Sequence, residues 1–439
     1  MTPDGAFDNL PSDNLPSDTI ATSRDALNGL AVGDAFGAQH FVPDNLPALR
    51  ARRLPPGEWP WTDDTEMACS VQRAIMRHAG LDQDELARSF ALRHDFDRGY
   101  GPAMNRMLRL SRQGGDWREL AADLFDGQGS WGNGAAMRVA PLGARFPADP
   151  ARAAEQAALS ATVTHTHPEA VAGAVAVAVA ASRAAAGRTR QVTGADLVDA
   201  VLELTPPGRV HDGVAEAREL LGQPHAELAA HRLGNGRLVS AVDTVPFAVW
   251  CAARHLTDFE GALWATASAG GDVDTTCAIV GGIVAARVGT EGIPVAWRER
   301  TEPLPAWYRG EEPADRPPVA DRFPCPCCGH LVHDEPPGSH AICPLCFWED
   351  DLSQLRRPHL GGGANRVPLI EAQRNVQDFG ACDRRGLRFT RRAGPDEPLE
   401  AGWRPIDPRR DSFEEGDAEG RPPSPSDPTT LYWWRPGRA

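Results

Sequence analysis

Two short segments of the chain place carboxylates and hydroxyls at the expected start of an apolar helix. Residues 61–65 read Trp-Thr-Asp-Asp-Thr, and residues 270–276 read Gly-Gly-Asp-Val-Asp-Thr-Thr. Either segment alone is typical of a helix cap, because Asp and Thr side chains accept hydrogen bonds from the free N–H groups of a first turn. Capping needs only one such side chain, whereas each segment has two carboxylates. Four carboxylates at the edge of a core would repel one another unless a cation neutralised them, so the sequence predicts a metal site.

The ligand type limits the choice of metal. Oxygen ligands without histidine or cysteine favour Mg²⁺, Mn²⁺ or Ca²⁺ over zinc. Two such cations sharing carboxylates would orient vicinal hydroxyls of a substrate and activate water. The two segments therefore predict a magnesium-type site for a hard divalent cation, at which a pair of cations would suit hydrolytic chemistry.

A second group of possible metal ligands lies nearer the C-terminus. Cys325 and Cys328 form one C-x-x-C pair, and Cys343 and Cys346 form another, with fourteen residues between the pairs. Each pair starts Cys-Pro and the first ends in glycine, which suits the tight turn of a zinc knuckle. Four thiolates in tetrahedral geometry predict a closed, structural zinc site. Cys327 is left over, and three nearby histidines could replace a cysteine ligand: His330, His333 and His340.

Helical periodicity dominates the region that must position the aspartates. Apolar residues recur at helical spacing from about residue 25 to 290, and we expect helices at 169–186, 239–253, 259–269 and 274–288. Glycines at positions 29, 33 and 37 would let another backbone approach one helix face closely. No long run alternates with period two. The expected fold class is all-α, a helical bundle with a small C-terminal zinc-ribbon-like module.

Composition divides the chain into five expected segments. Residues 1–22 contain a tandem repeat with little apolar content, which predicts a disordered tail. The expected helical domain spans 23–302, a proline-rich linker 303–320 and the cysteine-rich module 321–386. Residues 387–439 are expected to form a mostly disordered tail, although their aromatic end at 431–434 could dock.

Charge and composition argue against several classes of function. A net charge of −15 is unlike that of nucleic-acid binders, which usually carry a basic excess. All 45 basic residues are arginine, so a Schiff-base lysine and a P-loop lysine are both excluded. The best apolar stretch, 170–181, is shorter than the ~20 residues of a membrane helix, and the acidic N-terminus does not resemble a secretory signal. We therefore expect a cytoplasmic protein without a membrane partner.

Five motifs together resemble those of the ADP-ribosylglycohydrolase family, which includes dinitrogenase-reductase-activating enzymes and serine- or arginine-ADP-ribosylhydrolases. They are Gly-Leu-Ala-Val-Gly-Asp-Ala-Phe-Gly at 29–37, Trp-Thr-Asp-Asp-Thr at 61–65, Gly-Asn-Gly-Ala-Ala-Met-Arg at 132–138, Thr-His at 164–165 and Gly-Gly-Asp-Val-Asp-Thr at 270–275. The resemblance extends from about residue 24 to 290, in family order. It implies an all-α bundle with two Mg²⁺ or Mn²⁺ ions. Their ligands would be Thr62, Asp63, Asp64, Asp272, Asp274 and Thr275.

The resemblance also implies a loop that holds the diphosphate and distal ribose of the substrate. The loop consists of Ser130, Trp131, Gly132, Asn133 and Gly134. Its glycines would let backbone N–H groups come close to an anion, although the loop alone is equally typical of an ordinary turn. Trp131 falls where relatives often have an aromatic residue near the adenosine.

Two further segments match the family. His165 belongs to a Thr-His pair that lies near the phosphates in relatives, whereas a lone histidine at a helix start is more often structural. The segment Arg98, Gly99 and Tyr100 resembles one found in bacterial members and is assigned to the cleft wall.

The expected reaction is hydrolysis of an N- or O-glycosidic bond at ribose C1″ of an ADP-ribosylated protein, with Asp63 or Asp64 orienting or deprotonating the water. Relatives usually follow the glycine motif with a stretch that ends in Glu. Here residues 38–41 read Ala-Gln-His-Phe, and no carboxylate comes before Asp44, which leaves the general acid open. Two alternatives remain: hydrolysis of another ADP-ribose conjugate, such as a nucleic-acid end or a metabolite, and non-catalytic binding of ADP-ribose or a partner, as in an immunity-type protein.

Residues 322–385 resemble the small cysteine-rich CPCC family. The match rests on the cysteine pairs with Trp-Glu-Asp-Asp at 348–351, Gly-Gly-Gly-Ala-Asn at 361–365 and Glu-Ala-Gln-Arg-Asn at 371–375. It implies a zinc-ribbon-like module with one structural Zn²⁺ and no known reaction. We expect the module to serve structure or the recruitment of a protein partner.

Overall fold

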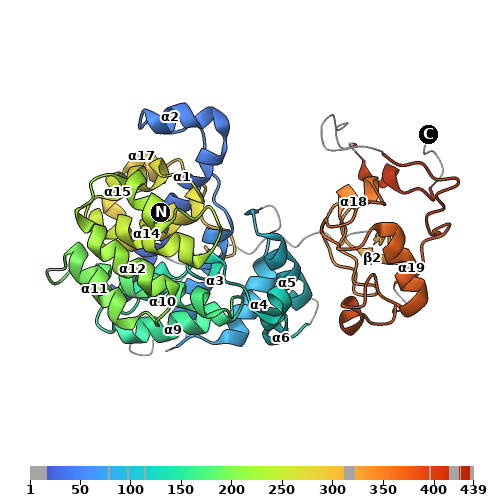
Figure 1. Cartoon of the computed structure of the whole chain (residues 1–439), viewed down its shortest axis with the longest axis horizontal. Coiled ribbons are helices and arrows are strands. Elements are labelled where there is room, and N and C mark those ends of the chain that lie inside the picture. Colours follow the sequence, from blue (N-terminus) through green and yellow to red (C-terminus); the bar gives the residue numbers. More distant parts are fainter. Residues whose placement is uncertain are drawn as a thin grey trace. The chain divides into compact units, whose positions relative to one another are not determined.

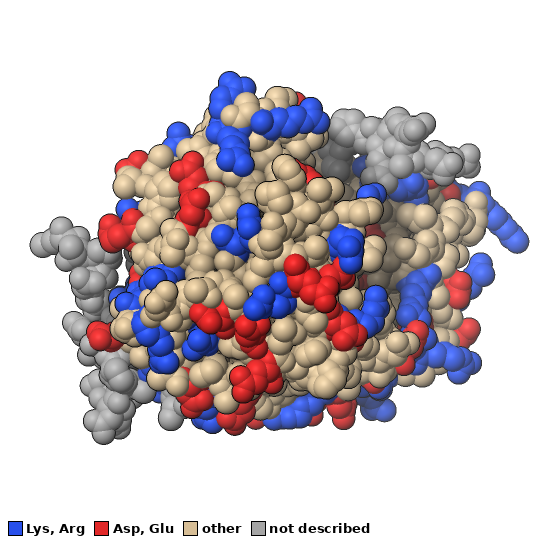
Figure 2. Space-filling model, turned by 60° about the vertical axis from the view of Figure 1, so that its left-hand side comes forward, with Lys and Arg blue, Asp and Glu red and all other residues tan. Residues whose placement is uncertain are grey.

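The computed structural model describes residues 17–77, 80–95, 98–112, 115–310, 322–394, 397–414, 425 and 427–435. The chain separates into two compact units that meet in the sequence at Pro313 and Ala314. The first unit is a bundle of helices, and the second combines two short strands, short helices and loops (Figure 1). On the face that Figure 2 shows, acidic and arginine side chains are interspersed. The all-α fold class with a small cysteine-rich module is therefore confirmed.

The helical unit contains α-helices joined mostly by short loops and single 3₁₀ turns. They are α1 (Ser17–Ala38), α2 (Leu46–Arg50), α3 (Asp63–Arg77), α4 (Gln83–Arg93), α5 (Pro102–Arg112), α6 (Trp117–Ala122), α7 (Leu124–Gly127), α8 (Ala140–Ala144), α9 (Pro150–Thr162), α10 (Pro168–Ala186), α11 (Gly194–Leu204), α12 (Arg209–Glu219), α13 (Ala226–Leu233), α14 (Ala241–Arg254), α15 (Phe259–Ser268), α16 (Val273–Val288) and α17 (Val295–Arg298). The expected helices at 169–186, 239–253, 259–269 and 274–288 correspond to α10, α14, α15 and α16.

Helices α1 and α16 pack against each other in opposite directions, and the predicted glycine stripe forms their interface. A Cβ atom at Gly33 would overlap the carbonyl group of Cys277, and one at Gly37 would overlap the backbone of Asp274. A Cβ atom at Gly29 would likewise overlap α16, closer to the C-terminal end of that helix. Because no side chain separates the two backbones, the start of α16 lies directly beside the end of α1.

Helix α10 is a long, apolar helix of the core. Its 19 residues make it long and apolar enough to span a membrane by length and composition, so the apolar segment is longer than the sequence analysis expected. However, 83% of its most apolar window is buried inside the protein. Such burial is typical of the central helix of a globular core.

The boundaries of the helical unit differ from those expected. Residues 1–16 of the expected N-terminal tail lie outside the described residues, whereas 17–22 already form the first turns of α1. In the expected linker, Tyr308 is buried and its hydroxyl donates to Oε1 of Gln72 at 2.7 Å. Trp61 Nε1 donates to the carbonyl of Pro303 at 3.1 Å. The chain up to about residue 309 therefore belongs to the helical unit, and 311–320 lie outside the described residues.

The second unit is built around the strands β1 (Phe323–Pro324) and β2 (Leu331–His333), which pair antiparallel, and the helices α18 (Leu352–Arg356) and α19 (Leu369–Phe379). Residues 397–414 and 427–435, expected to be mostly disordered, pack onto it. Tyr432 and Trp433 are buried, and the Tyr432 hydroxyl donates to the carbonyl of Pro324 at 3.1 Å. Aromatic side chains in the last segment thus supply apolar surface that its overall composition does not indicate.

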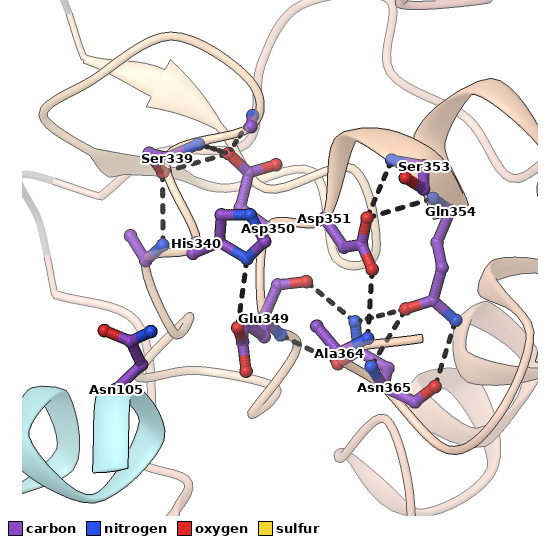
Figure 3. Close-up of polar contacts among 12 residues, drawn as sticks. Asn105, Ser339, His340, Glu349, Asp350, Asp351, Ser353, Gln354, Ala364 and Asn365 are labelled. Atoms are coloured by element: carbon purple, nitrogen blue, oxygen red, sulfur yellow. Dashed lines mark hydrogen bonds and ion pairs between the residues drawn. The ribbon is translucent and has the colours of Figure 1, made fainter. Parts of the chain in front are cut away.

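A buried polar network links the loops of the second unit (Figure 3). Asp350 accepts from the backbone N–H and hydroxyl of Ser339 at 3.1 and 3.0 Å. Asp351 accepts from the backbone N–H of Ser353 at 2.7 Å and that of Ala364 at 3.0 Å. Successive carboxylates therefore tie different loops together, which accounts for the Trp-Glu-Asp-Asp motif as a structural feature.

Candidate metal and substrate site

Asp34, in the second half of α1, holds the start of α3. Its buried side chain accepts hydrogen bonds from the backbone N–H groups of Thr62 at 2.9 Å and Thr65 at 3.1 Å. The hydroxyls of the same threonines also donate to it, at 2.8 and 2.6 Å. Burial raises the pKa of Asp34 to about 6, although the hydrogen bonds oppose that rise. A carboxylate of one helix thus caps another and determines where α3 begins.

Asp64 joins the two aspartate segments. It is buried in the first turn of α3, and its Oδ2 accepts from the hydroxyls of Thr62 at 3.1 Å and Thr275 at 3.4 Å. Its Oδ1 is buried and has no hydrogen-bond partner among the described residues. A buried carboxylate oxygen without a partner is costly, and a bound cation would satisfy it. The structure therefore brings the segments at 61–65 and 270–276 into one place.

Asp272, immediately before α16, is held by the glycine loop. Asn133 Nδ2 donates to Oδ2 of Asp272 at 2.7 Å and to the hydroxyl of Thr244 at 3.0 Å. Asp274, in the first turn of α16, accepts from the backbone N–H of Thr275 at 2.8 Å. One amide side chain therefore connects the predicted anion loop directly to a predicted metal ligand.

The clustered carboxylates destabilise one another's charged forms. Burial, together with the charges of neighbouring carboxylates, raises the pKa of Asp63, Asp64 and Asp274 well above the usual range. Burial also raises the pKa of Asp272. Protons or cations must therefore balance this charge at neutral pH.

The donor set fits hard divalent cations. Carboxylates and the hydroxyls of Thr62 and Thr275 are oxygen donors, as Mg²⁺ and Mn²⁺ prefer, and Asp64 Oδ1 is available. A group of at least three Cys, His, Asp or Glu side chains whose ligand atoms all lie within 4.8 Å of one another could hold a metal ion. Within the described ranges, the only such group consists of cysteines of the second unit. Among the described residues, no three aspartate side chains bring their oxygens within that distance of one another.

The aspartates line a pocket of about 560 Å³. It brings together most of the site residues predicted from the sequence: Asp63, Asp64, Gly99, Ser130, Trp131, Gly132, Asn133, Gly134, His165, Asp272, Asp274 and Thr275. Thr62, Arg98 and Tyr100 do not line the pocket. Phe125, Leu238 and Val239, which the sequence analysis did not select, do line it.

The His165 ring lies against the glycine loop. A Cβ atom at Gly134 would come within 2.9 Å of the ring and one at Gly132 within 3.3 Å, so glycines at both positions leave room for the imidazole. Burial, and secondarily the charge of Arg138, lowers the pKa of His165 to about 3. His165 is therefore a neutral imidazole at the pocket wall.

A chain of hydrogen bonds fixes the orientation of that imidazole. The fully buried Arg138 donates from Nη1 to the hydroxyl oxygen of Thr164 at 2.9 Å. The same hydroxyl lies 2.7 Å from Nδ1 of His165. Because arginine can only donate, the Thr164 hydroxyl keeps its own hydrogen. When that hydrogen is donated to Nδ1, the ring proton lies on Nε2, beside the glycine loop. The sequence analysis assigns no role to Arg138 or Thr164, although both belong to family motifs. Their contacts show that they position the imidazole of His165.

Aromatic and apolar side chains form the rim of the pocket. Phe125 and Trp131 pack with ring centroids 4.7 Å apart, and 44% and 38% of their surfaces remain exposed. Phe125 and Val239 adopt positive φ angles of 52° and 49°, which are unusual for side chains of this size. At both positions the strained backbone keeps an apolar side chain exposed to solvent at the pocket mouth.

Arg98 and Tyr100 support the pocket wall from behind. Arg98 forms two hydrogen bonds to the carboxylate of Glu302, at 2.7 and 2.8 Å, and its guanidinium lies 3.5 Å from the ring centre of Trp61. The buried Tyr100 hydroxyl donates to Oε2 of Glu66 at 2.7 Å. Of the three residues assigned to the cleft wall, Gly99 therefore faces the pocket, and its two neighbours anchor the segment.

The stretch after Gly37 contributes no side chain to the pocket. Gln39 donates to the carbonyl of Ala35 at 3.3 Å, and His40 packs edge-on against Phe36 at a centroid distance of 4.7 Å. The pocket's acidic lining among described residues consists of four aspartates from the two segments. The position at which relatives carry a glutamate therefore has no counterpart here.

The cysteine pairs of the second unit converge as predicted. Cys325 and Cys346 have sulfur atoms 3.6 Å apart, as do Cys328 and Cys343, and all four are buried. Four sulfurs at about 2.3 Å from a tetrahedral zinc would be about 3.8 Å apart, close to these distances. Gly329 has φ +77°, as the knuckle turn requires. The four cysteines therefore form a cluster that could hold a metal ion.

The remaining candidates lie outside this cluster. His330 contacts the carbonyl of Glu397 at 2.7 Å through Nδ1, and His340 contacts Oε1 of Glu349 at 3.1 Å. Neither His330, His333, His340 nor Cys327 belongs to the four-residue group. The predicted ligand set of two C-x-x-C pairs thus stands without a histidine substitute.

Residues 16–323 match the ADP-ribosylglycohydrolase family, and residues 323–397 match the cysteine-rich CPCC family. The chain is similar to ADP-ribosylhydrolase ARH3 of Gallus gallus, with 29% identity over 331 residues, 64% of this chain and 89% of the relative. ADP-ribosylhydrolase ARH3 of Homo sapiens is 29% identical over 273 residues, 55% of this chain and 74% of the relative.

A bacterial enzyme and a solved structure are also similar. The ADP-ribosyl-dinitrogen reductase glycohydrolase of Rhodospirillum rubrum is 25% identical over 293 residues, 63% of this chain and 89% of the relative. A structure titled ADP-ribosylglycohydrolase-related protein complex superposes with a TM-score of 0.44 at 26% identity, covering 68% of this chain and 100% of that one. Since the family match spans well over half of the sequence, this protein belongs to the ADP-ribosylglycohydrolase family.

Proposed function

We propose that this protein hydrolyses the glycosidic bond between ADP-ribose and a modified protein side chain, and so reverses mono-ADP-ribosylation. The observation that carries the proposal is the meeting of two aspartate segments, a glycine loop and a neutral histidine in one pocket. Family membership supports hydrolysis of an ADP-ribose conjugate. The relatives named for ADP-ribosylhydrolase activity support the same reaction class.

The residues that would hold two Mg²⁺ or Mn²⁺ ions are Thr62, Asp63, Asp64, Asp272, Asp274 and Thr275. When bound, the ions would offset the aspartate charges, fix the ribose hydroxyls and make a water molecule more acidic. The unpartnered Oδ1 of Asp64 and the gathering of four carboxylates in one pocket support bound cations at this site.

The pocket's own side chains would supply the remaining chemistry. Asp63 or Asp64 would orient the attacking water and take its proton as the new bond to C1″ forms. The bond from C1″ to the side-chain nitrogen or oxygen breaks, and the leaving atom takes up a proton. The ring of aspartates would stabilise the positive charge that develops on the ribose in between.

The rest of the pocket would bind the ADP portion. The Nε2–H of His165 and the backbone of residues 130–134 would donate to the phosphates. The paired rings of Phe125 and Trp131 provide a platform on which an adenine could stack. Gly99 and its neighbours would close the pocket opposite the loop.

In the second unit, we propose one structural Zn²⁺ held by Cys325, Cys328, Cys343 and Cys346. The sulfur spacing and complete burial support a closed site rather than a catalytic one. The unit would stabilise itself through the metal and present its surface to a protein partner.

A second candidate function is binding of ADP-ribose or of a partner without turnover. The observation that favours it is the missing carboxylate between Gly37 and Asp44. A cluster of buried charge is costly to retain without a use, which favours catalysis. Hydrolysis of a non-protein ADP-ribose conjugate uses the same pocket and differs only in the leaving group.

The decisive experiment measures ADP-ribose release from ADP-ribosylated proteins of defined linkage, with Mg²⁺ or Mn²⁺. We expect turnover by the wild-type chain and at least a hundredfold loss in Asp272→Asn/Asp274→Asn. An exposed carboxylate variant, Asp199→Asn, is the matched control and should retain wild-type rates. Equal rates in the double variant and the wild type would refute the mechanism, whereas tight ADP-ribose binding without release would favour the binding protein.

A further inference from the structure

A second cavity, of about 470 Å³, lies in the helical unit away from the aspartate pocket. Its walls come from α3 and α4, which pack side by side (Figure 1), and from Trp307. None of its lining residues also lines the aspartate pocket. Arg73 follows Asp64 by nine residues along α3, which at 1.5 Å per residue separates the two sites by about 13 Å along that helix.

Four arginines line this cavity: Arg73, Arg77, Arg88 and Arg93. Basic residues are favoured in the last turn of a helix, and that accounts for Arg77 in α3 and Arg93 in α4. Arg73 and Arg88 lie earlier in their helices, so the helix dipole does not account for them. Burial lowers the pKa of Arg73, and repulsion from the guanidinium groups of Arg77 and Arg93 lowers it further.

The acidic residues of the cavity are already engaged. Glu85 pairs with Arg77 at 2.7 Å, and Asp84 pairs at 2.8 Å with Arg118, which does not line the cavity. Asp82 accepts from a backbone N–H at the start of α4. Among the described residues, Arg77 is thus the lining arginine that forms an ion pair with a carboxylate of the cavity, while the charges of Glu85 and Asp84 also act on Arg73 and Arg88 at longer range.

Three guanidinium groups remain without a carboxylate partner in the described part of the chain. Arg73 donates to the carbonyl of Trp307 at 2.7 Å, and the Arg93 guanidinium lies 5.0 Å from the centre of the Trp307 ring. Arg88 is exposed at the cavity edge. The contacts of Arg73 and Arg93 with Trp307 orient these two side chains without neutralising them.

Neutral hydroxyl donors complete the lining. The hydroxyl of Ser89 donates to that of Ser70, which is 1% exposed, at 3.0 Å and would have to turn to donate to a ligand. Guanidinium groups beside hydroxyls form the donor set that recognises the oxygens of a phosphoryl group, because several donors converge on one doubly charged acceptor.

We propose that this cavity is a second anion site, which binds a phosphoryl group independently of the aspartate pocket. The ligand would be inorganic phosphate, pyrophosphate or the phosphate of a small organic molecule. Its charge would relieve the repulsion of Arg73 with Arg77 and Arg93. Its oxygens would accept from Arg73, Arg88, Arg93 and Ser89. The site does not depend on the proposed hydrolase activity, because no residue is shared between the two cavities.

The test is calorimetric titration of the full-length chain with inorganic phosphate and pyrophosphate at low salt. We expect one class of sites to weaken at least tenfold in Arg88→Gln/Arg93→Gln, and less strongly in Ser89→Ala. The matched control, Arg218→Gln/Arg254→Gln, removes two exposed arginines elsewhere on the unit and should bind both anions as the wild type does. Thermal unfolding of each variant verifies that the fold is retained.

Variants of the two cavities separate this proposal from the proposed function. His165→Ala should retain the class of sites that Arg88→Gln/Arg93→Gln loses, even if the chain shows no hydrolase activity. The double variant should in turn keep wild-type turnover of a small ADP-ribosylated substrate. Unchanged anion affinity in Arg88→Gln/Arg93→Gln, or an equal loss in the control double variant, would overturn the second site.

Discussion

Replacing Asp34 with asparagine should stabilise the helical unit when no divalent cation is present. The pKa of the buried Asp34 carboxyl is about 6, against 3.8 for an unperturbed aspartate. The difference, 6 − 3.8 = 2.2, corresponds at about 1.4 kcal/mol per unit to a cost of about 3 kcal/mol for ionising the group at pH 7. Asparagine carries no charge, and its oxygen can still accept from the N–H groups of Thr62 and Thr65. Its amide would face the Thr62 hydroxyl, which can rotate to accept.

The effect should depend on pH with a definite sign. Because the folded state raises the pKa, the folded protein holds a proton that the unfolded chain releases, and wild-type stability falls as pH rises from about 4 to about 6. The gain in Asp34→Asn should therefore be absent at pH 4 and complete, at up to about 3 kcal/mol, above pH 6. Mg²⁺ should reduce the gain, because the cation offsets the same charge. Asp34→Ala should be less stable than Asp34→Asn at every pH, since two buried N–H groups lose their acceptor at about 1–3 kcal/mol each.

The assay is guanidinium chloride unfolding followed by far-ultraviolet circular dichroism. Wild type, Asp34→Asn, Asp34→Ala and the exposed control Asp199→Asn are compared at pH 4 and 7.5, with EDTA and with Mg²⁺. If Asp34→Asn is no more stable than wild type at pH 7.5 in EDTA, the assignment of Asp34 as a destabilising buried charge is refuted.

Three further predictions test the supporting structure. Thr164→Val should destabilise the helical unit by about 1–3 kcal/mol and weaken ADP-ribose binding, because Arg138 loses an acceptor and Nδ1 of His165 loses its donor. Nitrogen NMR of the His165 ring should show the change of tautomer, and Thr164→Ser should restore the wild-type signal. Gly33→Ala should cost about 1–3 kcal/mol in thermal unfolding, because a Cβ atom meets the Cys277 carbonyl, whereas Gly222→Ala, in open space, should cost nothing measurable. We expect metal analysis to find one zinc ion in the wild type and in Cys382→Ser, and none in Cys343→Ser; zinc at full occupancy in both variants would contradict the four-cysteine site.

The sequence allows much of the site to be predicted because its functional groups occur in short motifs. Two carboxylates within three residues at a helix start, or two cysteines three apart, are already close in space before the chain folds. The glycine stripe of α1 likewise shows a local period, and another backbone packs closely on it as expected, although the sequence does not indicate that this is α16. In these cases local spacing alone indicates the arrangement.

The contacts that the sequence does not indicate join distant segments. Asp34 is one of three aspartates in α1, and its sequence position does not indicate a partner. Only the folded chain shows that the hydroxyls of Thr62 and Thr65 donate to it. Arg98 finds its partner Glu302 more than two hundred residues away. Phe125 reaches the pocket because the backbone there adopts a positive φ, which the type of residue does not suggest. The aromatic residues at 431–434 similarly pack on a surface of the second unit, and the composition of the segment does not indicate where that surface lies.

The ion pair between Arg98 and Glu302 has a practical consequence for where the helical unit can be cut. The last helix, α17, ends at Arg298, yet Glu302 holds the pocket wall and Tyr308 packs against α3. A fragment ending directly after α17 would retain all the helices of the unit and both aspartate segments, but its substrate pocket would lose the anchor of one side. The smallest active fragment should therefore extend through Tyr308, ten residues beyond the last helix.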